Sequence, residues 1–205
     1  MVIHTPRPDG GKRGLFVVVY GANNLGKSAQ MDLLEKDWGV MGRKCTRLKY
    51  PIYDTPTGRL INQALRGGDA GKLDLSDEIL QFLFAENRRL YQSELWRLLS
   101  QGDVLGEDYT GTGLAWGLTK GVSRKLLDEY NEGLIVPDVA VLLDGERFTC
   151  GIERGHRHED GGEALWQRNR EIHLELAHEF GWLVVDANRT PEAVHEEIMR
   201  YIGSF

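Results

Sequence analysis

The sequence predicts an α/β fold of three layers, a five-stranded parallel sheet flanked by helices on both faces. Short apolar runs alternate with longer amphipathic segments along the chain, which is typical of a doubly wound sheet. With 205 residues and no long stretch rich in proline, serine or one sign of charge, the chain fits a single core. We therefore expect one domain over residues 14–205, preceded by a flexible N-terminal tail over residues 1–13.

Each predicted strand is a short apolar run bounded by turn-forming residues. The five runs are Leu15–Tyr20, Cys45–Tyr50, Asp103–Gly106, Val139–Asp144 and Trp182–Asp186. The first of them is the longest strongly apolar run, and it is far too short to cross a bilayer. We therefore expect no membrane contact.

The segments between these runs have the length and the periodicity of helices. The longest, Ser76–Ser100, carries apolar side chains at three- and four-residue spacing, with Ser76 as a plausible cap. Pro191 suits the first turn of the last helix, where its missing N–H costs nothing. The other predicted helices are Gly26–Trp38, Pro56–Leu65, Leu114–Glu132, Glu163–Phe180 and Pro191–Ile202.

The stretch Gly151–Gly162 is polar and rich in glycine. We expect it to stay out of the core and to form a mobile lid over about residues 151–162.

Charge and cysteine content limit the partners of the chain. A formal charge of −6 and a pI near 5.6 argue against a duplex-binding surface, which needs an excess of Lys and Arg, so we expect no nucleic-acid partner. Cys45 and Cys150 are isolated, which favours reduced thiols and a cytoplasmic protein. A small anionic ligand remains possible, because it needs only a local positive site.

Residues 21–28 read Gly-Ala-Asn-Asn-Leu-Gly-Lys-Ser and match the phosphate-binding pattern GxxxxGK[ST] between a predicted strand and a predicted helix. Such a loop turns its N–H groups toward a phosphate, while Lys27 reaches the β- and γ-oxygens and Ser28 binds Mg²⁺. The alternative, a glycine-rich turn ending in Lys-Ser by chance, does not account for this context. No Asn-Lys-x-Asp guanine motif is present, so we expect ATP and a P-loop NTPase fold. The predicted nucleotide-binding residues are Gly21, Asn23, Asn24, Leu25, Gly26, Lys27, Ser28 and Ala29.

Carboxylates follow the third predicted strand, at the sheet edge where ligands bind in open α/β sheets. Glu107 is the preferred Mg²⁺ residue together with Ser28, either directly or through water, and Asp108 comes next to it. Asp144 is a weaker candidate at the end of the following strand. The alternative is that these are solvated loop carboxylates.

Several blocks, in the same order along the chain, resemble those of thymidylate kinases. They are residues 21–28, 84–88, 107–109, 137–144, 155–159 and 185–188. The resemblance extends from about Leu15 to Ile202. It implies a divergent P-loop nucleoside monophosphate kinase that uses ATP and Mg²⁺ to convert dTMP into dTDP. It also implies nucleotide contact by Asn188 and a possible homodimer, for which the long Ser76–Ser100 helix could supply the face.

The resemblance also implies roles around the acceptor nucleotide. Phe84 would stack on the base, Arg88 would hydrogen-bond it, and Trp116 would lie against the sugar and select deoxyribose. Asn23 stands where the family carries an acid that contacts the 3′-hydroxyl. The alternatives are a core phenylalanine, a surface arginine and a structural tryptophan.

The lid matches the family at Glu153–Arg157. Because Asn24 stands where some members carry an arginine, the resemblance implies that Arg154 or Arg157 supplies the transition-state cation. His156 and His158 we interpret as part of a solvated charge cluster, not as a metal site.

Two positions depart from the family pattern. Asp108 and Tyr53 stand where arginines would grip the acceptor phosphate, so Lys49, Arg59 or Arg88 would have to supply the cation. The departures leave two alternatives open. One is a deoxynucleoside kinase with Asp54 or Asp108 as its base, and the other is a catalytically inactive nucleotide-binding protein.

Overall fold

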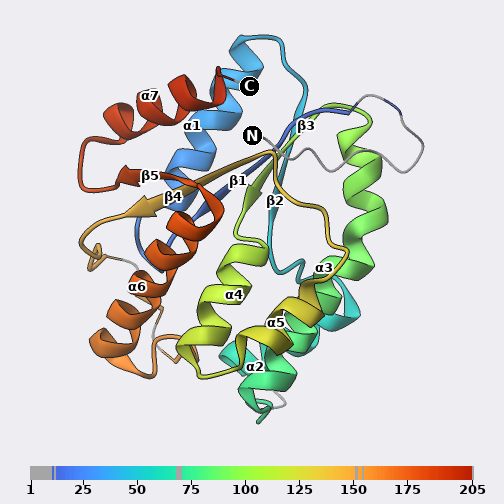
Figure 1. Cartoon of the computed structure of the whole chain (residues 1–205), viewed down its shortest axis with the longest axis vertical. Coiled ribbons are helices and arrows are strands. Elements are labelled where there is room, and N and C mark those ends of the chain that lie inside the picture. Colours follow the sequence, from blue (N-terminus) through green and yellow to red (C-terminus); the bar gives the residue numbers. More distant parts are fainter. Residues whose placement is uncertain (1–10, 12, 68–70, 151, 154, 205) are drawn as a thin grey trace.

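A computed structural model of the chain describes residues 11, 13–67, 71–150, 152–153 and 155–204. The predicted sheet of five parallel strands is confirmed, and its strands lie in the order β2-β3-β1-β4-β5 (Figure 1). Most of the predicted tail, residues 1–10 and 12, lies outside the described residues. The strands are β1 (Phe16–Tyr20), β2 (Cys45–Lys49), β3 (Asp103–Glu107), β4 (Val139–Asp144) and β5 (Leu183–Asp186).

The helices begin and end within a few residues of the predicted positions, with one exception. The predicted helix Leu114–Glu132 is wrong, because the chain forms two helices there. Gly121 adopts a left-handed φ of 82°, and Ser123 caps a new helix by accepting a hydrogen bond from the N–H of Leu126. The helices are α1 (Lys27–Val40), α2 (Pro56–Arg66), α3 (Asp77–Leu99), α4 (Thr110–Thr119), α5 (Arg124–Asn131), α6 (Gly162–Phe180) and α7 (Pro191–Ile202). None of them, within the part of the chain that is described, has the length and apolar character needed to traverse a bilayer.

Apolar side chains on β1 alternate between two cores, one on each face of the sheet. Val17 and Val19 pack against α1 and α7, whereas Phe16, Val18 and Tyr20 face the side covered by α3 and α6. This alternation follows from the two-residue period of a strand. It produces the three layers visible in Figure 1.

The central position of β1 determines where a ligand can bind. β1 pairs with β3 on one side and with β4 on the other, so their carboxyl ends meet at one edge. Sheets of this kind bind ligands where the strand order reverses. The loop over residues 21–26 leaves β1 at this edge and leads directly into α1.

Candidate active site

The phosphate-binding motif forms a tight loop ahead of α1. Gly26 caps the helix with a left-handed φ of 81°, and Asn24 is also left-handed, at 63°. The ammonium of Lys27 donates to the carbonyl oxygens of Gly21, at 2.7 Å, and Ala22, at 3.1 Å. It lies 3.8 Å from the Asp108 carboxylate. A glycine-containing turn before a helix start is the geometry that binds phosphate groups.

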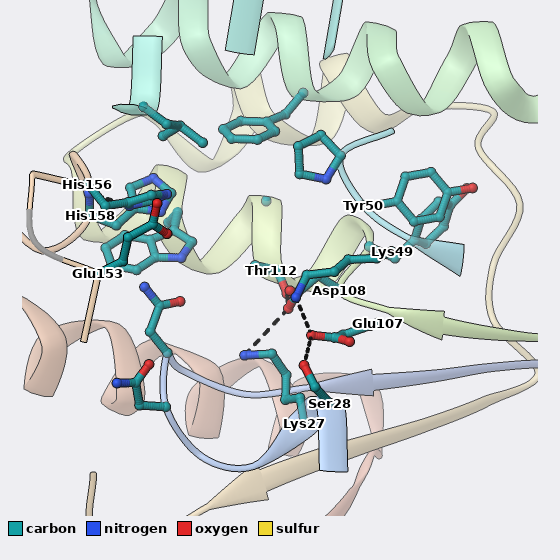
Figure 2. Close-up of a pocket in the computed structure, with 18 of the residues that line it drawn as sticks. Lys27, Ser28, Lys49, Tyr50, Glu107, Asp108, Thr112, Glu153, His156 and His158 are labelled. Carbon is teal, nitrogen blue, oxygen red and sulfur yellow. Dashed lines mark hydrogen bonds and ion pairs between the residues drawn. The ribbon is translucent and has the colours of Figure 1, made fainter. Parts of the chain in front are cut away.

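Glu107 lies at the centre of a charged cluster beside this loop (Figure 2). Its side chain is only 2% exposed and accepts hydrogen bonds from Ser28 Oγ at 2.8 Å, Lys49 Nζ at 2.7 Å and Arg47 at 3.2 Å. Burial raises the pKa of Glu107, but the hydrogen bonds and the charge of Lys49 outweigh it, so this pKa lies below its usual value. Glu107 is therefore an anion at neutral pH.

Ser28 and Glu107 together offer a hydroxyl and a carboxylate, the hard oxygen ligands that Mg²⁺ prefers. The described residues include no group of three His, Cys, Asp or Glu side chains that could enclose a metal alone. This donor set fits Mg²⁺, which keeps several waters and binds through one or two protein oxygens plus substrate phosphates.

Asp108 follows Glu107 with a left-handed φ of 60°. Thr112 donates a hydrogen bond of 2.8 Å to its carboxylate, which is mostly buried. Burial raises the pKa of Asp108, while the charge of Lys27 opposes this shift. The position where the resemblance expects an arginine therefore holds a carboxylate.

One cavity of about 330 Å³ joins the phosphate loop to the predicted acceptor residues. Arg66, Leu65, Gln81 and His158, none of them predicted as site residues, also contribute to its wall. The predicted residues on this wall are Asn23, Asn24, Leu25, Gly26, Lys27, Ser28, Ala29, Lys49, Tyr53, Phe84, Arg88, Glu107, Asp108 and Trp116.

The far part of the cavity has aromatic walls. The rings of Trp116 and His158 are stacked, with centroids 3.8 Å apart and planes inclined by 13°, and Phe84 lies 6.4 Å from His158. Figure 2 shows His156 beside His158 at this end. The interpretation of His156 and His158 as part of a solvated charge cluster is therefore wrong, because both side chains are buried. Burial lowers the pKa of His158 well below its usual value, so the imidazole packs as a neutral aromatic ring.

Arg88 is buried, and the surface alternative for it is wrong. Its side chain is 4% exposed, one Nη donates to Asn131 Oδ1 at 3.0 Å, and Nε has no hydrogen-bond partner among the described residues. Burial lowers the pKa of Arg88, and Tyr109 is the largest influence in the opposite direction. A buried guanidinium with a donor to spare can bind a polar group of a ligand.

Asn23 is tied to the segment that follows β4. Its side-chain amide donates to Glu159 at 2.8 Å, and its backbone carbonyl oxygen accepts a hydrogen bond of 2.8 Å from the Trp166 indole. Glu159 also forms an ion pair with Arg147, whose side chain is largely buried. Sequence reasoning missed Arg147, because a single arginine after a strand carries no periodic or motif signal.

Four other predicted residues have different surroundings. Arg157 donates to the Leu75 carbonyl at 2.7 Å and to Asp77 at 3.1 Å. The Asn188 side chain accepts a hydrogen bond from the N–H of Glu146 and donates one to the carbonyl oxygen of the same residue. Neither residue lines the cavity, nor does Gly21, and Arg154 lies outside the described residues.

Comparisons with known proteins agree with this geometry. The family model for thymidylate kinase matches residues 19–198. The chain is 29% identical to human thymidylate kinase over 195 residues, covering 91% of this chain and 89% of the human one. It is 27% identical to the Dictyostelium discoideum thymidylate kinase over 200 residues, covering 94% and 86%. A probable thymidylate kinase of Thermococcus kodakarensis is 31% identical over 199 residues, covering 92% and 97%.

A solved structure of thymidylate kinase from Candida albicans shares the fold. Its TM-score is 0.78 at 22% identity, and the match covers 94% of this chain and 92% of that one. This match confirms the predicted P-loop NTPase fold. From the family match over most of its length, the chain belongs to the thymidylate kinase family of nucleoside monophosphate kinases.

Proposed function

We propose that this chain transfers the γ-phosphate of ATP to dTMP and so produces dTDP and ADP. One observation carries the proposal: the phosphate loop, the Ser28–Glu107 pair and the aromatic side chains of Phe84 and Trp116 line the same cavity. A donor and an acceptor bound in one cavity can react as an intramolecular pair.

On the donor side, the loop over residues 21–26 and the start of α1 bind the phosphates of ATP, and Lys27 neutralises their charge. Ser28 and Glu107 would hold Mg²⁺, which would supply positive charge against the phosphates of ATP. Lys49 and Arg47 keep Glu107 ionised, and this is the protonation state that the metal requires.

On the acceptor side, the thymine ring stacks on Phe84, and Trp116 lies against the sugar. Arg88 lines the same cavity, where its guanidinium can donate to a carbonyl oxygen of the base. The bulk of Trp116, held in place by His158, disfavours a ribose 2′-hydroxyl. Tyr53 and Asp108 complete this part of the wall.

In the transfer, an oxygen of the dTMP phosphate forms a bond to the γ-phosphorus of ATP. The bond from this phosphorus to the β,γ-bridging oxygen breaks, and its electron pair stays on ADP. The attacking phosphate is already an anion, so no protein base is needed, and catalysis depends on positioning and charge neutralisation.

Three further proposals concern the transition-state cation, the oligomeric state and the location of the protein. Arg154 and Arg157 remain candidates for the transition-state cation, and Arg157 would have to leave Asp77 to act in this way. Family membership supports a homodimer. Cys45 and Cys150 are free thiols, which supports a cytoplasmic location.

The test is ADP release with Mg²⁺-ATP and a panel of deoxynucleoside monophosphates, ribonucleotides and free deoxynucleosides, with Lys27→Ala as the blank. We expect selective turnover of dTMP. Turnover of another monophosphate would change the substrate, and turnover of nucleosides alone would favour the deoxynucleoside kinase. In that case Asp108, which lines the cavity, is the candidate base, whereas Asp54 is exposed and does not line it. Binding of ATP without any transfer would indicate an inactive nucleotide-binding protein.

A further inference from the structure

Arg66 is a cation of the cavity wall that no motif identifies. It is the last residue of α2, and its side chain is 34% exposed. Its Nε and one Nη contact the two carboxylate oxygens of Glu153 at 2.6 and 3.1 Å. The other Nη donates to the Tyr53 hydroxyl at 2.7 Å. Glu153 comes from the lid, and Figure 2 shows it beside His156 and His158 in the pocket.

Arg66 differs in its surroundings from the other cations that line the cavity in the described part of the chain. Lys27 lies within the phosphate loop, Lys49 binds the buried Glu107, and Arg88 is enclosed among tyrosines. Only Arg66, of these four, is paired with a carboxylate on an exposed segment, because the Glu153 side chain is 50% exposed. Such exposed pairs contribute little to stability, so an anionic ligand can displace the carboxylate.

The contact with Glu153 has the geometry of an anion-binding site. A guanidinium presents parallel N–H groups that bind a carboxylate or a phosphate in the same two-point manner. A phosphate monoester carries about −1.5 to −2 charges at pH 7, more than one carboxylate. A phosphate in this cavity is therefore the stronger ligand for Arg66.

Tyr53 orients the guanidinium. Its hydroxyl accepts one N–H, and the guanidinium carbon lies 5.1 Å from the centre of its ring. These two contacts leave the Nε and Nη that face Glu153 available for exchange. Tyr53 itself thus carries no charge, but its hydroxyl holds the charged guanidinium of Arg66.

We propose that Arg66 binds the phosphate of the acceptor nucleotide and that Glu153 competes with this phosphate for the same N–H groups. The inference rests on the proposed function, because it assigns a residue to the acceptor site of that reaction. With Arg66 in this role, the acceptor phosphate has a cation to bind, which neither Asp108 nor Tyr53 provides.

The test compares binding of dTMP, thymidine and Mg²⁺-ATP to wild type, Arg66→Ala and Glu153→Gln. Calorimetry measures the two nucleotides, and NMR titration measures thymidine. The matched controls are Arg97→Ala and Glu94→Gln, since Arg97 also lies in the last turn of a helix and pairs with a carboxylate. Thermal unfolding of each variant verifies that it is folded.

We expect Arg66→Ala to weaken dTMP binding by about 10- to 100-fold, as for a charged hydrogen-bonding group, and to leave thymidine and ATP binding within about twofold of wild type. Glu153→Gln should strengthen dTMP binding by about two- to fivefold, the worth of an exposed ion pair. Equal losses for dTMP and thymidine, a loss for ATP, or weaker dTMP binding in Glu153→Gln would each overturn the proposal.

Turnover of dTMP by the wild type separates the two hypotheses. If the wild type converts dTMP while Arg66→Ala binds it as tightly as wild type, only the assignment of Arg66 fails. If the wild type neither binds nor converts dTMP, the proposed function fails, and the assignment fails with it.

Discussion

Gly113 allows the Arg88 guanidinium to lie close to the backbone of α4, and replacing this glycine tests how firmly Arg88 is positioned. A Cβ at residue 113 would lie 2.4 Å from one Nη of Arg88 and 3.0 Å from its Cζ. Both distances are far inside van der Waals contact. Because Arg88 is buried and hydrogen-bonded to Asn131, Gly113→Ala must displace the guanidinium or distort the helix.

The expected magnitude follows from two opposing effects. Alanine is a better helix former than glycine by about 1 kcal/mol, whereas overpacking in a tight site costs about 1 to 3 kcal/mol. We therefore expect Gly113→Ala to lower the free energy of unfolding by about 0 to 2 kcal/mol. Displacement of the Arg88 donors should also raise the KM for dTMP by about tenfold or more.

Gly39→Ala is the matched control, because this glycine also lies in a helix and a Cβ there would have nothing within 4 Å. It should stabilise the protein by about 0.5 to 1 kcal/mol. Urea unfolding and the KM for dTMP, measured on both variants, decide the matter. If Gly113→Ala is stabilised as much as Gly39→Ala and keeps the wild-type KM, the reasoning about Arg88 is refuted.

Three further predictions address the metal, the loop after β2 and the pH dependence of stability. Glu107→Gln removes the charge beside Ser28, so half-maximal activity should need at least about tenfold more Mg²⁺; an unchanged Mg²⁺ titration would contradict the metal role. Asn87→Ala removes an amide whose oxygen accepts a hydrogen bond from the Ile52 N–H and whose two N–H groups donate to acceptors in the segment 52–57. Urea unfolding should show a loss of about 3 kcal/mol, whereas a loss below about 1 kcal/mol would show that solvent replaces these bonds. Burial lowers the pKa of His173 from 6.5 to about 4, with the nearby Lys27 charge acting in the same direction. The folded state therefore keeps His173 neutral. The contribution of His173 to the free energy of unfolding is complete above pH 6.5 and falls by about 3 kcal/mol as the pH drops toward 4. Unfolding free energies at pH 7.5 and 5 should differ less in His173→Gln than in wild type, and equal differences would disprove the assignment.

Local sequence patterns were sufficient to predict most of the fold. The strand runs and helix periods correspond to contacts within one element and to which face of it is buried. Ser76 caps α3 as its position indicated, by accepting a hydrogen bond from the N–H of Ile79. The break between α4 and α5 was missed, because a Gly-Val-Ser step inside an amphipathic stretch is a weak signal when judged by periodicity alone.

The candidate site likewise has a part that local sequence patterns predicted and a part that they did not. The loop over residues 21–26 and Glu107 were predicted from the sequence as site residues, because a motif of eight consecutive residues and a strand end specify their positions locally. Other features of the site were not predicted. Arg88 is buried, His158 stacks on Trp116, and Arg66 pairs with Glu153, so the last two contacts join residues 42 and 87 positions apart. No local pattern encodes such contacts, since they depend on how α2, α3, α4 and the described residues between β4 and α6 pack around the carboxyl edge of the sheet.

The sequence by itself thus determined the order of strands and helices along the chain. It also determined the position of the loop with the phosphate-binding pattern, between β1 and α1. The tertiary structure decided which cations and aromatic rings share the cavity and which carboxylate each cation binds. The physical reason is range: backbone geometry and side-chain periodicity act between neighbours in the chain, whereas burial and charge pairing act between whichever side chains the folded layers bring together.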